Sequence, residues 1–448
     1  MASAVAAGLG VLLSATSAAR AGNYESFFLG TEAALQGGAT TATARLGTAI
    51  WYNPAGLARV DRSAIDASVT AFSLSLGQNV DLASTLPGSE ATRLKAVAFD
   101  VVPAALTYAR QLSFGGGGFG LFVPEQNTQL LRTRLRAPGA TGEGARELSV
   151  DIYSRQQSYH GGPAFGFSLG PRLDLGGALF VVYRNSLDNS SLAGALDTAG
   201  TPILLTVHTA QDEQTFGIQP VAGVQVHPGA GWELGFVVRL PTLRVFRQSQ
   251  AIEMSLLATP AIADAPPAFV DDFGEDSGFA GGVMAPLQMH LGVASEIAGG
   301  QLSLDGSYRA PYSNAALGID ERAVFNLRVG GRIPTSENVT LGAGLFSDRA
   351  ADRLADNPDG RRIHYYGASF GIQLDTKYGV ISRAGVTLPR EEPLIFRTTL
   401  AVSYLLGVGE LERIQLREDD AGMVDIEAVQ QHVVDHQIVL HLGATVLN

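Results

Sequence analysis

The sequence contains no cysteine and little charge. Without cysteine there can be no disulfide, thiol nucleophile, thiolate metal site or lipoprotein anchor. Charged residues make up 17% of the 448 positions, below the roughly 25% that is usual in soluble domains. The net charge of −12 offers no basic field for a polyanion, so no nucleic-acid partner is expected.

Long apolar runs are also missing. Beyond residue 21 no stretch of about 18 apolar residues runs without proline or charge, so helical membrane spans are not expected. Glycine, by contrast, is abundant at 53 residues, and hydrophobic residues make up 46% of the chain. This composition is typical of many strands joined by turns rather than of a helical protein.

The first 21 residues read MASAVAAGLGVLLSATSAARA. An apolar run that ends in Ala19-Arg20-Ala21 matches the small-x-small cleavage rule of a secretory signal, although no lysine or arginine precedes Arg20. We therefore predict a signal peptide over residues 1–21. The alternative is a short N-terminal helix of the mature fold.

From residue 63 onward apolar and polar residues alternate. The clearest runs lie at 301–309, 325–333 and 438–446. In a strand the two sets lie on opposite faces, one apolar and one polar. Lipid outside and a polar lumen inside would require this pattern. A soluble sandwich makes the same pattern with its apolar face inward, so alternation alone does not decide.

The connections favour a transmembrane antiparallel β-barrel. Short joints are expected at 115–117, 170–173, 228–231, 299–300, 334–337 and 375–378. Longer polar segments are expected between them at 77–95, 127–146, 187–201, 259–278 and 347–361. Tight periplasmic turns and long external loops are typical of outer-membrane barrels. Residues 63–448 are thus predicted to form an all-β barrel of about fourteen strands. Counts of 12 and 16 stay open because prolines interrupt 378–408.

Residues 22–62 show no sustained alternation. The segment is rich in small residues and lies between the predicted signal and the predicted barrel. A fourteen-stranded barrel would otherwise enclose an open pore. We therefore predict that residues 22–62 form a hatch that plugs the lumen.

Within this segment the run Trp51-Tyr52-Asn53-Pro54-Ala55-Gly56-Leu57 resembles the hatch of the FadL/TodX family of outer-membrane transporters. Pro54 fixes its own φ and keeps Asn53 out of the α region, while Gly56 tolerates unusual dihedrals. Asn53 can bond neighbouring backbone in a tight turn. The motif Asn53, Pro54, Ala55 and Gly56 is therefore expected to shape the hatch. An ordinary Asn-Pro turn without gating is the alternative.

The resemblance implies a monomeric channel in the bacterial outer membrane, surrounded by outer-membrane lipid. It implies passive uptake of hydrophobic compounds, such as long-chain fatty acids or aromatic hydrocarbons, with binding in the lumen and hatch-gated lateral release. In that family release is associated with an inward kink of the third strand. Here Gly118, Gly120 and Pro124 are the candidates for it, because glycine favours bulges and proline interrupts the ladder. A flexible turn followed by an edge proline is the alternative.

Four aromatic residues are expected to line the ligand pocket or pack the plug, since apolar pockets are lined by such groups. They are Phe27, Phe28, Trp51 and Tyr52. Arg155 is a candidate lumenal partner for a carboxylate. The sequence departs from outer-membrane proteins at its end, where Val446-Leu447-Asn448 stands in place of an aromatic residue.

No enzyme, cofactor or metal site is predicted. Ser168 and Ser369 each fit G-x-S-x-G, but a nucleophile elbow needs a following helix, and no helical periodicity follows either. His432 and His436 would stand about 13 Å apart on a strand rather than together. Asp271, Asp272, Glu275 and Asp276 are expected to be solvated loop charges. The functional alternative to uptake is a porin-like or structural barrel whose hatch does not gate.

Overall fold

The structure is a computed structural model that describes residues 23, 28–77, 102–138, 145–198, 201–258, 268–279, 281–314, 319–352, 361–383, 386–418 and 424–448. The predicted signal peptide and Phe27 lie outside these residues. Near the N-terminus are two short helices, α2 (Thr31–Leu35) and α3 (Leu46–Tyr52), and a 3-10 helix, η1 (Pro54–Arg59).

Strands make up nearly all of the rest. In chain order they are β1 (Ala64–Gly77), β2 (Val102–Leu112), β3 (Gly115–Pro138), β4 (Ala145–Ser168), β5 (Leu173–Thr198), β6 (Thr201–Gly229), β7 (Trp232–Arg239), β8 (Thr242–Ala258), β9 (Ala268–Phe279), β10 (Val283–Ala285), β11 (Gln288–Ile297), β12 (Gly300–Arg309), β13 (Tyr312–Asn314), β14 (Ile319–Glu321), β15 (Val324–Ser336), β16 (Val339–Asp348), β17 (Arg361–Arg383), β18 (Val386–Glu418) and β19 (Val424–Leu447).

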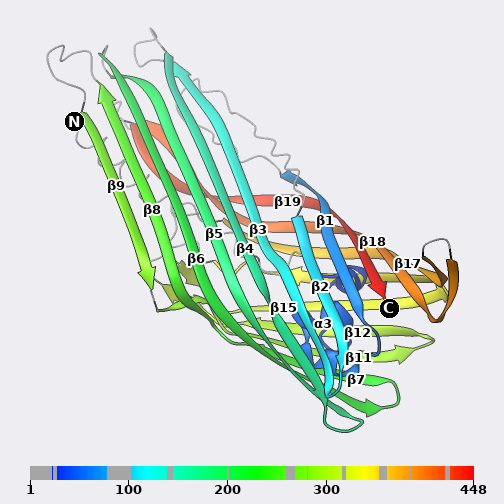
Figure 1. The fold of residues 1–448 in the computed structure, drawn as a ribbon. Coiled ribbons are helices and arrows are strands. Elements are labelled where there is room, and N and C mark those ends of the chain that lie inside the picture. The colour runs from blue at the N-terminus through cyan, green and yellow to red at the C-terminus, as the bar shows by residue number, and fades with distance from the viewer. Residues whose placement is uncertain are drawn as a thin grey trace.

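All of these strands except β13 and β14, which pair with each other, form one closed antiparallel sheet. β1 pairs with β2 on one side and with β19, the last strand, on the other. Four strands of the wall are interrupted and are therefore numbered in pieces: β7 with β8, β9 with β10 and β11, β12 with β13, and β14 with β15. Counted along the wall there are fourteen strands. This count confirms the predicted strand number. Figure 1 shows the strands arranged as a barrel.

Apolar and polar side chains are distributed over the two faces of the wall as an exterior in contact with lipid would require. On β12 and β15 the apolar Leu304, Phe325 and Leu327 are exposed, whereas Asp305 and Asn326 between them are buried. A soluble sandwich would bury the first set and expose the second. The alternating runs therefore point their apolar sides outward, and the polar sides face the lumen.

A band of aromatic rings marks one edge of the apolar outer surface. Ring contacts with centroid distances of 4.8–6.3 Å run across five neighbouring strands, through Tyr159, Tyr183, Phe216, Phe246 and Phe279. Aromatic girdles of this kind are found at membrane interfaces. On β4 the exposed Phe167 lies eight residues from Tyr159. At about 3.3 Å per residue and a tilt of about 40°, the apolar band is roughly 20 Å tall.

The strands continue well beyond this band, which corrects several predicted loops. β3 and β4 extend through most of 127–146, and β5 and β6 through most of 187–201. The acidic residues at 271–276 lie in β9 rather than in a loop. Above the band both faces carry polar residues, for example Gln156 and Gln157, so the alternation that reveals a strand is lost. Together these strands form a tall wall on one side of the barrel (Figure 1).

The predicted joint at 375–378 is wrong. These residues lie inside β17, which turns into β18 only after Arg383. Asp375 accepts two hydrogen bonds from Arg397 on β18, at 2.9 and 3.0 Å, so its charge is neutralised within the wall. Pro389 precedes Ile395, the first residue of β18 that pairs with β19. Its missing N–H therefore costs no ladder hydrogen bond on the β19 side of the strand. The predicted strand at 378–408 is therefore divided: residues 378–383 end β17, and the prolines lie at the start of β18.

The described residues between 28 and 62 lie inside the ring of strands. α2 contacts β1 and β16–β19, α3 contacts β1–β4, and η1 contacts β3–β6. Only an element within the cylinder can contact walls on all these sides, and the blue helices are seen there in Figure 1. None of the helices in the described ranges is long and apolar enough to cross a membrane.

Candidate functional site

The aromatic-Asn-Pro-Ala-Gly motif forms a tight turn between α3 and η1. Asn53 is completely buried. Its side-chain Nδ2 donates to Thr41 O at 2.9 Å and to Val224 O on β6 at 3.0 Å, and its Oδ1 accepts from Ala55 N at 3.1 Å. One amide group thus caps η1 and joins the segment to the wall. Pro54 begins η1, where a missing N–H is harmless.

The wall leaves room for the backbone of this segment through inward-facing glycines. A Cβ at Gly330 on β15 would lie 2.0 Å from Gln36 O, and a Cβ at Gly176 on β5 would lie 2.3 Å from Ala55 N. We call the glycines that meet backbone atoms of the segment in this way the glycine belt: Gly116, Gly166, Gly176, Gly235, Gly292, Gly330, Gly342 and Gly344. These contacts explain part of the glycine content, because no side chain would fit between the wall and the segment.

Charged and polar contacts fasten the segment to several strands of the wall. Arg45 Nη2 lies 2.6 Å from Glu233 Oε1 on β7, and Arg59 Nε lies 2.5 Å from Asp174 Oδ2 on β5. Elsewhere Thr41 N donates to Asp305 Oδ2 on β12 at 2.8 Å. Buried charged groups need such partners, and here each partner pair joins the segment to the wall. The described part of the N-terminal segment is thus joined to the wall of the barrel at these positions.

An aromatic cluster surrounds Trp51, which lies near the C-terminal end of α3. Its ring lies 5.0 Å from that of Phe122, 5.3 Å from that of His160 and 5.7 Å from that of Phe180, which belong to β3, β4 and β5. The guanidinium carbon of Arg239 lies 3.9 Å from the Trp51 ring centroid, and Arg239 also donates to Trp51 O. A cation stacked on an indole stabilises this arrangement.

A pocket opens beside this cluster. Its cavity volume is about 60 Å³. The segment contributes Leu29, Trp51 and Tyr52, and β3 contributes Pro124. The remaining walls come from β7, β11, β12, β15 and β16 and from residue 349.

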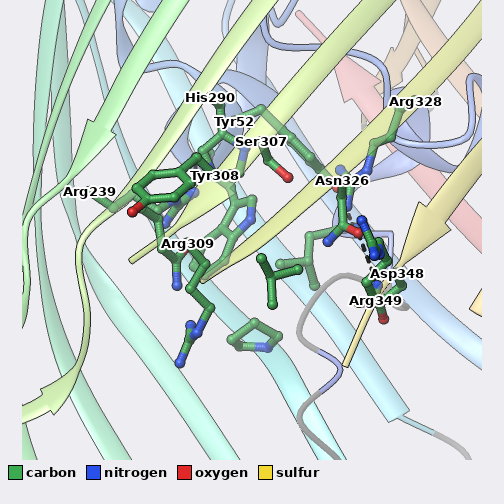
Figure 2. A pocket seen from close by; sticks show the side chains of 15 residues that line it. Tyr52, Arg239, His290, Ser307, Tyr308, Arg309, Asn326, Arg328, Asp348 and Arg349 are labelled. Carbon is green, nitrogen blue, oxygen red and sulfur yellow. Dashed lines mark hydrogen bonds between the residues drawn. The ribbon is translucent and has the colours of Figure 1, made fainter. Parts of the chain in front are cut away.

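The pocket is rich in arginine. Arg239, Arg309, Arg328 and Arg349 line it, together with a single carboxylate, Asp348. In Figure 2, Arg239 and Arg309 lie on one side and Arg328 and Arg349 on the other. Arg309 is also paired with Glu321, whose Oε2 lies 3.1 Å from its Nη2. The balance of charge is positive, so the pocket suits an anionic group better than a cation.

The residues proposed for a third-strand kink lie in two different settings. Gly118 and Gly120 pair regularly with β2 and β4, and a Cβ on either would press on Ile50 of α3, so they make room for that helix. Pro124 lies within the register shift between Phe122 and Glu125, where the pairing of β3 with β2 has also ended. The irregularity is therefore at Pro124, beside the pocket.

The other candidates are placed as follows. Phe28 is buried and its ring lies 5.0 Å from that of Phe346, so it packs α2 against the wall. Trp51 and Tyr52 line the pocket. Arg155 is exposed on β4, on the face opposite the buried Ser154 and Gln156, and the structure does not bring it to the pocket. The pocket arginines were not singled out from the sequence, because no local motif marks them: Arg239, Arg309 and Arg328 belong to strands, and Arg349 follows one.

The serine motifs do not form a catalytic set. Ser168 Oγ donates to Asp174 Oδ1 at 2.6 Å, and His227 Nε2 lies 2.8 Å from Asp174 Oδ2. The carboxylate, not the histidine, thus lies between the other two groups, whereas a nucleophilic serine needs the histidine beside it. Ser369 is buried against Gly37. In the described ranges no group of three or more potential ligands could hold a metal ion.

Fold and site together define a closed β-barrel with an apolar exterior, which encloses an N-terminal segment and an arginine-lined pocket. No family model and no curated protein matches the sequence.

Several solved structures share the fold. A FadL homologue from Pseudomonas aeruginosa is 14% identical, with a TM-score of 0.55 over 94% of this chain and 99% of that one. The toluene transporter TodX from P. putida is 12% identical, with a TM-score of 0.54 over 94% and 99%. The monoaromatic hydrocarbon channel CymD is 12% identical, with a TM-score of 0.53 over 93% and 97%. The chain therefore has the fold of the FadL/TodX channels.

Proposed function

We propose that the protein is a bacterial outer-membrane channel for passive uptake of hydrophobic compounds. The observation that carries the proposal is the pocket itself, which lies inside the barrel between strands of the wall and Leu29, Trp51 and Tyr52 of the N-terminal segment. A solute bound there is enclosed by the wall. We infer an N-terminal hatch at 22–62, a barrel at 63–448 and a signal peptide at 1–21.

The charge of the pocket favours one of the two ligand classes implied by the sequence. Four arginines around Trp51 and Tyr52 would bind a carboxylate through charge-assisted hydrogen bonds, with apolar contacts left for the rest of the molecule. A neutral hydrocarbon would leave these groups without a ligand partner. Long-chain fatty acids, or other acids with an apolar body, therefore fit better than toluene-like compounds.

For release we infer a lateral route at Pro124. The residue lines the pocket and lies in the register shift of β3, so pocket and wall irregularity meet there. The glycine belt and the ion pairs of Arg45 and Arg59 oppose movement of the hatch as a whole. Lateral passage at β3 needs only a local change in the wall.

Uptake can be measured with proteoliposomes that carry an acyl-CoA-forming trap inside. Addition of oleate should load the trap several times faster with the protein than with empty liposomes, while a small hydrophilic sugar should enter no faster. If sugars pass freely and oleate shows no acceleration, the protein is a porin-like channel and the proposal is wrong.

Deletion of the hatch tests the porin-like alternative directly. Removal of residues 28–62 should raise single-channel conductance in planar bilayers several-fold, because the segment contacts strands on all sides of the lumen. The control is the full-length Gly306→Ala variant, whose new Cβ would lie 3.7 Å from its nearest neighbour. Equal conductance with and without the segment would mean that it does not close the barrel.

A further inference from the structure

Four neighbouring strands of the wall are interrupted at the same height. The breaks fall between β7 and β8, β10 and β11, β12 and β13, and β14 and β15. Proline occupies three of them, at Pro241, Pro286 and Pro311, and Pro220 lies beside them in β6. Proline cannot donate to a sheet ladder, so its recurrence here removes hydrogen bonds from adjacent strands.

The register shows that these breaks form one row. Val221 pairs with Arg239, Arg239 with Gln288, and Gln288 with Arg309, while Arg309 pairs with Val324. Each of these residues, except Val221 in the middle of β6, is the last or the first of its strand. Below the row the wall is fully paired from β6 to β15.

Above the row the wall divides. β10 remains with the main sheet through its pairs with β8, but β13 and β14 form a separate two-stranded sheet. Among the described residues no backbone pair joins β10 to β13. A side-chain hydrogen bond bridges them instead, from Tyr312 Oη to Val283 O at 2.5 Å. We call this boundary between β10 and β13 the seam.

The β13–β14 pair is fastened on its other side. Glu321 forms a bridge with Asp352 and an ion pair with Arg309, and Arg322 N donates to Ala351 O at 2.8 Å. The bridge and the Arg322 hydrogen bond hold the pair to the segment that follows β16, and the ion pair holds it to the end of β12. The seam is therefore a boundary where side-chain contacts replace backbone pairing, and Tyr312 is the latch across it.

The seam adjoins the pocket. Arg239, Gln288, Arg309 and Val324, which form the row of strand ends, all line the pocket. Pro124 lines it on the β3 side. The pocket therefore extends from one irregular part of the wall to another.

The height of the row places the seam in the apolar band. On β6, Pro220 lies four residues below Phe216 of the aromatic girdle, or about 10 Å along the barrel axis. The exposed side chains nearby are apolar, namely Leu240, Leu243 and Phe279. An opening here would meet lipid rather than water.

The route from above is less suited to an apolar solute. Inward-facing side chains of the tall wall form charged pairs between strands: Arg184 on β5 with Glu125 on β3 at 3.4 Å, and Arg247 on β8 with Glu213 on β6 at 3.0 Å. Such a lining favours water. A solute of low solubility, which concentrates in lipid, would avoid this route by entering through the wall.

We propose that the seam between β10 and β13 is a lateral entrance through which apolar acids pass from the outer leaflet into the lumenal pocket. The inference rests on the proposed function and adds a second opening to the one at Pro124. Tyr312 restricts passage, and the arginines at the row of strand ends receive the acid group as it enters.

A cross-link across the seam tests this entrance. The chain has no cysteine, so Val283→Cys with Tyr312→Cys can be bridged by a cleavable bis-maleimide without side reactions. The probe is a brominated stearate placed in the outer leaflet of proteoliposomes, and the readout is quenching of Trp51 in a Trp232→Phe background. Linking should slow quenching at least tenfold, and cleavage of the linker should restore the rate.

Two controls make the outcome specific. The pair Val238→Cys and Met289→Cys spans β7 and β11, which are already hydrogen-bonded, so linking it should leave the rate unchanged. Tyr312→Phe, which removes only the latch hydroxyl, should raise the rate about threefold.

Quenching that is equally fast with the seam linked and open overturns the entrance but leaves the proposed function intact. Failure of the unlinked Trp232→Phe protein to be quenched overturns the proposed function itself.

Discussion

Asn53 shows how much one side chain can hold in place. It is fully buried and satisfies two carbonyl groups and one amide, of which one carbonyl belongs to the barrel wall. The sequence predicted the turn because Asn-Pro and the following glycine restrict the backbone. It did not predict the partner on β6, which depends on a contact between residues 171 positions apart.

Replacement of Asn53 by alanine should loosen the hatch. The three buried backbone groups would lose their partners, at a cost of about 1–3 kcal/mol each where water cannot replace them. We expect faster tryptic cleavage after Arg45 and Arg59 and a lower unfolding temperature in detergent. Asn338→Ala, in an exposed turn, is the control and should change neither. Unaltered cleavage in Asn53→Ala would show that the amide does not hold the segment.

Arg349 provides a test of ligand charge, since it lines the pocket outside the strands. Arg349→Gln should weaken oleate binding about tenfold, which corresponds to the roughly 1.4 kcal/mol of one charge-assisted hydrogen bond. Binding of methyl oleate, which has no charge, should be unchanged, and Arg349→Lys should recover part of the affinity. Isothermal titration in detergent measures all three. An equal loss of affinity for the acid and the ester would mean that Arg349 acts through the shape of the pocket and not through its charge.

At the scale of elements, the glycine belt makes the wall fit the hatch. A Cβ at Gly330 would lie 2.0 Å from a backbone oxygen, which no side-chain movement can relieve. Gly330→Ala should therefore displace the segment near Gln36 and raise bilayer conductance. Gly306→Ala, with 3.7 Å of clearance, is the matched control. Normal conductance in both variants would mean that the hatch tolerates a shift and does not depend on this close contact.

Strand prediction succeeded where one face met lipid and failed where neither did. In β15 and β19 the alternation of apolar and polar residues gave the correct faces, with Phe325, Leu327 and Ile438 outward. Above the girdle the strands are polar on both sides, and they were assigned to loops. The turn at 375–378 was wrong because the charge of Asp375 is neutralised by Arg397 on the neighbouring strand, a pairing that is not visible in a local window.

The pocket and the seam were beyond the reach of sequence analysis for a similar reason. Trp51 and Tyr52 belong to a motif and could be named, but the arginines around them come from four separate parts of the chain. The prolines at 220, 241, 286 and 311 are unremarkable one by one. Only the register of the closed sheet brings them to one height.

At the scale of the whole molecule, the barrel encloses a positively charged pocket between an irregular β3 and the seam, above a hatch that is joined to the wall. We predict that an apolar acid moves from the membrane into the lumen through the barrel wall. Trp51 reports on this directly, because the other tryptophan, Trp232, can be replaced and is exposed at the opposite edge of the apolar band.

The most direct test is the fluorescence of Trp51 in the Trp232→Phe protein, titrated with stearates brominated at different positions along the chain. Saturable quenching that is relieved by excess oleate is predicted, with the strongest effect from bromine near the carboxyl end, beside the arginines. The result would contradict a binding site in the lumen if the fluorescence stayed constant, or if it fell only in proportion to the concentration of quencher in the lipid. Either result would also contradict the proposed uptake.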